Sequence, residues 1–258
     1  MTPKSKKTRP INLLTNNIEF QFHRKTGKLF NKIVEKVGRK GGKKMFEQAV
    51  NYKNGLYEEL SKIGKGLSSD RRLEILDLLT QAPKSVETIA NGVGISVANA
   101  SRHLQILKDS HLVKTKRKGN HIIYSLSSPK ISDLVHLLTD IGNSELSDMK
   151  TIQDKSDAQD NVKTISLKQA QEEYKNCFVL DVRPSDEYAA GHIQSAINVP
   201  LETLKESMPK LPKDQKIIVY CRGRLCANSN IATQILNRNG FDAVSLNSSH
   251  YDWNKITE

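Results

Sequence analysis

The 258-residue sequence predicts two domains: a mainly α-helical domain with a helix-turn-helix and a β-hairpin, then an α/β domain with a central, mostly parallel sheet. Three observations predict this. Residues 51–143 contain serine-capped helical segments followed by two alternating strands. Residues 164–258 alternate short buried strands with helices. Between them, residues 144–163 are polar and lack periodic apolar positions, so we interpret them as a linker.

Three serines mark the helices of the first domain. Ser69, Ser85 and Ser96 can each cap a helix through the side-chain oxygen, and the third helix is predicted to run to Asp109. Two glycines just before Ser96 break the chain between the second and third helices. A helix-turn-helix requires such a break.

The third helix and the segment after it carry candidate contacts to nucleic acid. Four apolar residues at spacings of three, four and three are expected to face the core: Val97, Ala100, Leu104 and Leu107. The opposite face holds Asn99, Arg102, His103 and Ile106, and Asn and Arg can read base edges in a major groove. Two predicted strands, within residues 111–126, flank a basic Gly-Asn turn that suits phosphates through Lys116, Arg117 and Lys118.

In this order, these elements resemble the ArsR-type winged-helix regulators. The pattern Ser96-x-x-x-x-Ser101-x-His103-Leu104-x-x-Leu107 is similar to their recognition helix, and the resemblance covers residues 55–142. It implies binding to double-stranded DNA through Ser96, Asn99, Arg102, His103, Lys116, Arg117 and Lys118. The apolar runs 56–67 and 134–141 exceed the needs of a small core, so we expect a homodimer on a near-palindromic operator.

Metal sensing is common in that family, but the ligands are not evident in this sequence. The helix of residues 85–91 has no cysteine, and Asp133 with His136 has no second histidine-acid pair downstream. We therefore expect no metal site.

In the second domain, a cysteine follows a short buried strand. Residues 216–220 form this strand, and residues 227–238 are predicted to form the next helix. Cys221 thus lies on a tight loop where backbone N–H groups and a helix N-terminus can face one anion. Arg222 and Arg224 add positive charge. These effects favour a thiolate at Cys221, as a nucleophilic sulfur requires.

A second stretch, Asp181-Val182-Arg183 through Glu187-Tyr188 and Gly191-His192-Ile193 to Asn198-Val199-Pro200, resembles the rhodanese sulfurtransferase signature. The resemblance covers about residues 165–255. It implies that Cys221 takes a sulfane sulfur from thiosulfate or a related donor and passes it to a thiol acceptor, without a cofactor. The donor would be cradled by Arg222, Gly223, Arg224, Leu225 and Cys226. By the same resemblance, Asp181 and Arg183 brace the loop and His192 holds the backbone.

The sequence departs from that family at two places. The loop has its glycine at position 223 and ends in Cys226, and Asn247-Ser248-Ser249 replaces a glycine pair after the last strand. These changes leave the shape of the pocket wall open. Cys226 is either a resolving cysteine, which would make the loop a redox switch, or a small buried residue at the helix start.

Cysteine use and hydropathy favour a cytoplasmic protein without membrane association. Cys177 precedes an apolar strand and is expected in the core, and three cysteines without close ligand spacing do not form a disulfide framework or a zinc finger. No long apolar run and no signal-peptide core are present.

The formal net charge of +12 arises almost entirely from residues 1–44, which hold 13 Lys and Arg and only 2 acidic residues. Two interpretations of a basic extension at residues 1–50 remain. It is a real arm for DNA phosphates, or residues 1–44 result from a misassigned start, because Met45 would be an ordinary first residue for such a regulator. DNA binding by the helix-turn-helix does not depend on this charge.

Three functions are consistent with these observations. The chain is a transcription regulator whose rhodanese domain handles reactive sulfur, or a sulfurtransferase that the helix-turn-helix merely tethers or dimerises, or a pure binding protein whose loop has lost its chemistry. The presence of Cys221 argues against the last.

Overall fold

The computed structural model describes residues 41–160 and 162–257, and its contacts divide the chain into a first unit that ends at Lys62 and a second that begins at Ile63. The expectations for residues 1–40 lie outside the described residues. Helix α2 (Gly41–Leu67) contains Met45, and the domain boundary predicted at residues 50 and 51 falls within it. In the first unit, α2 exposes several large apolar side chains, namely Met45, Phe46, Tyr52, Leu56, Tyr57 and Leu60.

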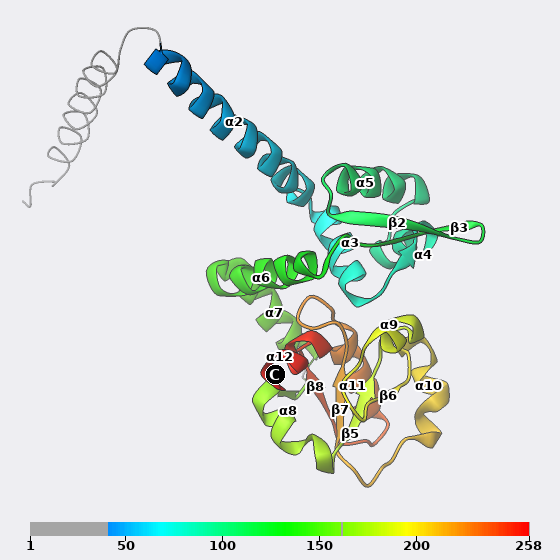
Figure 1. The fold of residues 1–258 in the computed structure, drawn as a ribbon. Coiled ribbons are helices and arrows are strands. Elements are labelled where there is room, and N and C mark those ends of the chain that lie inside the picture. Colours follow the sequence, from blue (N-terminus) through cyan, green and yellow to red (C-terminus); the bar gives the residue numbers. More distant parts are fainter. Residues whose placement is uncertain (1–40, 161, 258) are drawn as a thin grey trace, which may run out of the picture. The chain divides into compact units, whose positions relative to one another are not determined.

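The helix-turn-helix domain follows with the predicted elements and with a short strand, β1, that the sequence did not predict (Figure 1). They are α3 (Asp70–Gln81), β1 (Lys84–Ser85), α4 (Val86–Val93), α5 (Val97–Asp109), β2 (Val113–Lys118), β3 (His121–Leu126) and α6 (Pro129–Glu145). The three strands form an antiparallel sheet in the order β1-β3-β2. Arg117 and Lys118, predicted in the turn, are the last residues of β2.

Serine caps fix where these helices begin. The side chains of Ser69, Ser85 and Ser96 each accept a hydrogen bond from the backbone N–H three residues later, as the sequence predicts. Gly94, with φ of 66°, ends α4 in the left-handed region, where glycine is favoured. The turn between α4 and α5 is therefore set by local chemistry.

Three of the four residues predicted to face the core from α5 are buried: Ala100, Leu104 and Leu107. Val97 is 45% exposed, so that part of the prediction is wrong. Val97 is the first residue of α5, and the helical period alone does not show that the core ends before this turn.

Residues 144–163, interpreted as a linker, are largely helical. Helix α7 (Ser147–Asp160) occupies most of the segment, and Gln153 donates a hydrogen bond to Asn143 at the end of α6. The sequence did not predict this helix, because α7 is polar and has no apolar period.

The α/β domain contains five parallel strands in the order β4-β8-β7-β5-β6, which confirms the predicted fold class. Its strands are β4 (Thr164–Ile165), β5 (Phe178–Asp181), β6 (Ile197–Asn198), β7 (Ile217–Tyr220) and β8 (Ala243–Leu246). Its helices are α8 (Leu167–Glu173), α9 (Ser185–Ala190), α10 (Leu204–Ser207), α11 (Asn228–Arg238) and α12 (His250–Thr257). Short 3-10 turns lie at Tyr174–Asn176, Leu201–Thr203 and Met208–Lys210.

Helices cover both faces of the sheet (Figure 1). Alternate residues of its strands supply two separate cores. Ile217 and Val219 of β7 pack with Ala232 and Leu236 of α11. Ile218 and Tyr220, which point to the other face, pack with residues of α8 and α12 such as Trp253. A sheet covered on both faces explains why these strands are continuously apolar. The loop after β7 lies at the carboxyl end of a central strand, where parallel α/β folds place their sites.

None of the helices in the described ranges is long and apolar enough to cross a membrane.

Candidate sulfur loop and DNA-binding surface

The outer face of α5 presents the side chains that the sequence assigns to base contacts. Asn99 and Arg102 are exposed, whereas His103 is partly buried and its Nδ1 has no hydrogen-bond partner among the described residues. Ser96 has a local role as well, since its Oγ accepts the N–H of Asn99 at 3.3 Å and so begins the helix. The structure therefore brings Asn99 and Arg102 to one solvent-facing surface.

The hairpin carries Lys116, Arg117 and Lys118 on exposed backbone of β2. None of these three, nor Arg102, forms an ion pair with a carboxylate in the described part of the chain. Arg117 donates only to the carbonyl of Gly119, at 3.1 Å. These cations remain available for phosphates.

Residues 221–226, here called the sulfur loop, join β7 to α11. Cys221 follows β7 directly and its side chain is buried. Gly223 has φ of 104°, and a Cβ atom at this position would lie 3.3 Å from the backbone nitrogen of Ser249. Any side chain would therefore strain the loop. The segment Asn247-Ser248-Ser249, which replaces the expected glycine pair, forms the facing wall.

The two cysteines of the sulfur loop are in direct contact, with their Sγ atoms 2.9 Å apart. A hydrogen bond from Cys221, and then backbone N–H groups of Asn228 and Arg222 together with the Arg222 charge, lower the pKa of Cys226 to about 6. The same hydrogen bond, together with burial, raises the pKa of Cys221 well above its ordinary value. The two sulfurs therefore compete for one proton, and their contact favours the thiolate at Cys226 over the thiolate at Cys221.

This differs from the predicted thiolate at Cys221. An anion in the loop stays a prediction, and the sequence could not show that contact with Cys226 and burial would favour the thiol form of Cys221. Cys226 is partly exposed and lines a cavity of about 180 Å³ beside α7.

The two arginines of the sulfur loop already bind carboxylates. Arg222 donates from Nε and Nη2 to the two carboxylate oxygens of Glu187, at 2.9 and 2.7 Å. Arg224 donates to Asp157 of α7 at 2.8 Å, and Asn230 donates to the other oxygen of Asp157 at 2.9 Å. Leu225, between Arg224 and Cys226, is 53% exposed. The Arg222 charge acts to lower the pKa values of both Cys221 and Cys226.

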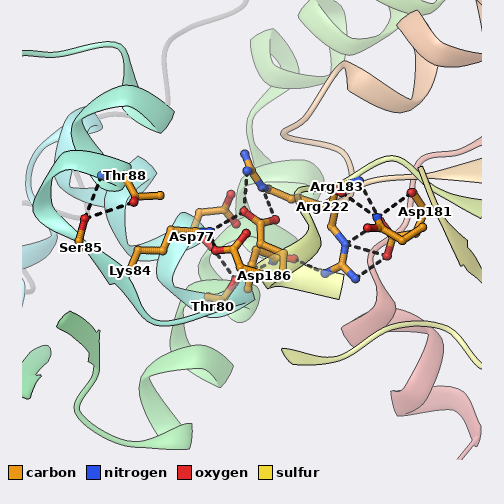
Figure 2. Close-up of polar contacts among 12 residues, drawn as sticks. Asp77, Thr80, Lys84, Ser85, Thr88, Asp181, Arg183, Asp186 and Arg222 are labelled. Atoms are coloured by element: carbon orange, nitrogen blue, oxygen red, sulfur yellow. Dashed lines mark hydrogen bonds and ion pairs between the residues drawn. The ribbon is translucent and has the colours of Figure 1, made fainter. Parts of the chain in front are cut away.

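Asp181 and Arg183 form a fully buried pair at the carboxyl end of β5 (Figure 2). The Arg183 guanidinium donates to Asp181 at 2.7 Å and to the carbonyl of Gly191 at 2.7 Å. It lies 5.6 Å from the ring centroid of Tyr220, the residue before Cys221. Asp181 and Arg183 thus brace the strand ends below the loop without contacting the sulfurs. The Nδ1 of His192 is 2.9 Å from the carbonyl of Tyr188, consistent with the expected backbone role.

The sequence did not predict the polar contacts that join the helix-turn-helix to the α/β domain. Lys84 of β1, 4% exposed, reaches Asp186 at 2.7 Å and Glu187 at 2.9 Å (Figure 2). Glu187 is fully buried, and it forms ion pairs with both Lys84 and Arg222. The burial of Lys84 indicates such a partner, since Lys is seldom buried without one, but this burial is visible only in the structure.

Three further contacts join the same two domains. Arg183 donates to Gln81 of α3 at 3.0 Å. Tyr251 of α12 donates to Asp133 at 3.0 Å and stacks on His136, with ring centroids 3.7 Å apart. The Asp133–His136 pair considered as a metal site therefore contacts the α/β domain.

A cavity of about 320 Å³ lies where these domains meet at the sulfur loop. Arg222, Gly223, Ser248 and Ser249 line one side, and Asp77 and His136 line the other. Burial raises the pKa of Asp77 to about 6, and the Arg222 charge only partly opposes this.

Comparisons with known proteins agree with this architecture. A helix-turn-helix domain model matches residues 67–116 and a rhodanese-like domain model matches residues 163–255. The HTH-type transcriptional regulator Rv0324 of Mycobacterium tuberculosis is 32% identical over 206 residues, which cover 78% of this chain and 89% of that protein. The chain belongs to the ArsR-type helix-turn-helix regulators that carry a C-terminal rhodanese domain.

Solved structures similar to each domain are known. A homodimeric winged helix-turn-helix DNA-binding domain from Mycobacterium bovis is 35% identical and covers 37% of this chain and 88% of its own, with a TM-score of 0.36. A rhodanese-related protein from Thermoplasma volcanium is 29% identical and covers 36% of this chain and 92% of its own, with a TM-score of 0.34.

Proposed function

We propose that this ArsR-type regulator binds operator DNA through its winged helix and that its rhodanese domain takes up sulfane sulfur on Cys221, so that transcription responds to reactive sulfur. The observation that carries this proposal is a pair of sulfurs 2.9 Å apart, in a loop whose backbone N–H groups favour a thiolate, in the same chain as a predicted recognition helix. The donor is thiosulfate or a related sulfane-sulfur compound, and the acceptor is a thiol.

DNA binding is supported by the surface of α5 and the hairpin. Asn99 and Arg102 are exposed where a recognition helix contacts base edges. Lys116, Arg117 and Lys118 lie on exposed hairpin backbone without a carboxylate partner among the described residues, so they are placed to contact phosphates.

A homodimer is supported by two groups of apolar residues that the described part of the chain leaves exposed. Leu56 and Leu60 of α2 are 53% and 60% exposed, and Leu137 and Ile141 of α6 are 56% and 48% exposed. Pairing of two copies would bury such residues. It would also separate two recognition helices by about 34 Å, one turn of DNA, on a near-palindromic site.

The sulfur step would begin with a thiolate at Cys221, formed when the shared proton rests on Cys226. This thiolate attacks the outer sulfur of thiosulfate, a new S–S bond forms, and the donor's S–S bond breaks with its electron pair on the departing sulfite. Cys221 is then a persulfide.

The deciding experiment measures DNA affinity and sulfur uptake on the same protein, with and without thiosulfate or polysulfide. We expect mass spectrometry to find the added sulfur on Cys221 and the affinity for the operator to change. Cys221→Ser should abolish both, whereas Cys177→Ser, in a half-buried residue outside the loop, should abolish neither. Steady turnover of thiosulfate with unchanged DNA affinity would instead identify a tethered sulfurtransferase.

A further inference from the structure

The contact between Cys221 and Cys226 has a chemical consequence beyond its effect on the two pKa values. We propose that Cys226 attacks the Cys221 persulfide, releases hydrosulfide and closes a Cys221–Cys226 disulfide, so that the sulfur loop stores the signal as a disulfide. This proposal rests on the proposed function, because it needs sulfur on Cys221 first.

The geometry supplies a nucleophile next to its target. The Sγ atoms are 2.9 Å apart, and no other sulfur lies in the loop. When Cys221 becomes a persulfide, Cys226 loses the hydrogen bond from the Cys221 thiol. Cys226 keeps the backbone N–H groups of Asn228 and Arg222 and the nearby Arg222 charge, all of which favour its thiolate.

The step balances without a further oxidant. The Cys226 thiolate attacks Sγ of Cys221, the new Sγ–Sγ bond forms, and the bond from Cys221 to its outer sulfur breaks. The proton that the first step left on Cys226 moves to the outer sulfur, which leaves as hydrosulfide with the electron pair. The two cysteine sulfurs are oxidised and the sulfane sulfur from the donor is reduced. A thiol reductant restores the pair.

This reaction favours sensing over transfer to an outside acceptor. An external thiol must reach Cys221, whose side chain is 1% exposed, whereas Cys226 is already in contact. An intramolecular nucleophile in contact has a large advantage over one in solution. The persulfide is therefore short-lived in the native chain and long-lived when Cys226 is replaced.

The test treats the full-length protein and its Cys226→Ser and Cys221→Ser variants with thiosulfate or polysulfide, and follows mass and released sulfide. The native protein should lose the mass of two hydrogens and release one equivalent of sulfide. Cys226→Ser should instead keep one added sulfur on Cys221.

Each result separates this inference from the proposed function. A native protein that keeps the added sulfur without disulfide overturns the resolving role and leaves the persulfide chemistry standing. In a second contrary result, Cys226→Ser takes up no sulfur and Cys221→Ser takes up sulfur on Cys226. This result would show that Cys226 receives the sulfur, and it would overturn both the proposed function of Cys221 and the attack by Cys226.

The buried ion pairs between the two domains are an independent observation. They suggest how the chemistry of the sulfur loop affects the DNA-binding domain. We infer that Glu187 transmits the charge state of the sulfur loop to Lys84 of the winged helix. Glu187 is fully buried, and its Oε1 accepts from both Arg222 at 2.7 Å and Lys84 at 2.9 Å.

Charges in such a network are not independent. A thiolate or persulfide in the sulfur loop attracts Arg222, and a disulfide removes that attraction, so the hold of Arg222 on Glu187 depends on the sulfur chemistry. Glu187 then binds Lys84 more or less strongly. Buried charges respond to such changes because little water screens them.

Lys84 is well placed to pass this change on. Its backbone pairs with Tyr124 of β3, one of the two hairpin strands, and the next residue, Ser85, caps α4. Helix α4 packs against the recognition helix α5. One lysine thus connects the rhodanese domain to both predicted DNA-contacting elements.

The test compares the change in operator affinity caused by polysulfide in the native chain, Lys84→Met, Lys84→Arg and the exposed control Lys130→Met. The native chain, Lys84→Arg and Lys130→Met should change affinity by about 5-fold or more, a usual size for coupled sites. Lys84→Met should lose most of this response, although it still takes up sulfur and binds untreated operator.

A Lys84→Met response equal to that of the native chain would overturn the inference and leave the proposed function intact. Absence of any sulfur uptake in the native chain would instead contradict the proposed function. If Lys84→Met fails to fold, the double-mutant cycle of Arg222→Lys and Lys84→Gln decides, because glutamine removes the charge: additive effects on the polysulfide response would exclude coupling.

Discussion

The DNA-binding surface and the sulfur loop both carry cations that the sequence assigns to anion binding, but the structure treats them differently. Arg102, Lys116 and Lys118 are exposed and form no ion pair among the described residues. Arg222 and Arg224 are each held by a carboxylate, at 2.7 and 2.8 Å. The first set is free to meet a polyanion in water. The second set shapes a small anion site and connects it to other elements.

The difference shows how the same residue type serves binding in one place and architecture in another. An exposed cation costs little to keep solvated and gains from releasing counterions when DNA binds. A cation beside a buried thiolate needs a fixed partner, because an uncompensated charge in that position would be costly. Replacing one arginine from each region should therefore have opposite consequences for stability and for binding.

The largest expected effect is on the stability of Arg222→Ala. This substitution leaves the buried Glu187 with Lys84 alone, so the free energy of unfolding should fall by about 3–5 kcal/mol, the usual cost of breaking a buried pair. Arg102→Ala should change it by less than about 0.5 kcal/mol, as for other exposed substitutions. Urea unfolding of both variants measures the contrast, and equal losses would remove the distinction between the two regions.

This expectation revises what the sequence predicts for Arg222. A cation beside a nucleophilic cysteine suggests ground-state attraction for an anionic donor, so the sequence predicts that Arg222→Ala mainly raises KM. Glu187 occupies both its Nε and its Nη2, so its loss should affect folding as well.

The next effect concerns DNA affinity. Arg102→Ala should weaken binding to the specific operator by about 1–3 kcal/mol, the usual value of one bidentate base contact, and should weaken binding to random DNA much less. Fluorescence anisotropy on both DNAs checks this. Equal losses on both would mean that Arg102 contacts only phosphate.

Local patterns made most of the fold predictable. Serine caps at Ser69, Ser85 and Ser96 and the apolar strand before Cys221 depend on neighbours within a few residues, and each is found where predicted. Helix α7 was missed because its stability does not depend on an apolar stripe.

The site was less predictable, because its decisive contacts join residues far apart in the chain. Lys84 and Glu187 are 103 positions apart, and nothing near Lys84 shows that its partner lies in another domain. Within the sulfur loop, the sequence places Cys221 and Cys226 five residues apart, but only the geometry shows their sulfurs in contact and gives Cys226 the lower pKa.

A smaller effect is expected for Asp77, the acid that faces Arg222 across the cavity. Burial raises its pKa from 3.8 to about 6, so between these pH values the folded chain holds a proton that the unfolded chain releases. The Asp77 contribution to stability therefore falls as pH rises through this window, and the penalty is complete above pH 6.

Asp77→Asn removes this penalty. It should stabilise the protein by about 1–2 kcal/mol at neutral pH and by nothing near pH 4, because there the native side chain is also neutral. Urea unfolding of both proteins at several pH values checks the sign. A benefit that does not vary with pH would show that Asp77 keeps an ordinary pKa.

The smallest effect is predicted for a single hairpin lysine. Lys118 ends β2, is exposed and has no carboxylate partner among the described residues, so its expected role is contact with one phosphate. Lys118→Ala should weaken binding to operator DNA and to random DNA by similar factors. It should also reduce the slope of log affinity against log salt by about 1. Lys168→Ala, an exposed lysine of α8 in the rhodanese domain, should leave both unchanged. A Lys118→Ala loss confined to the operator would mean that the hairpin reads sequence, and the contrast with Arg102 would then disappear.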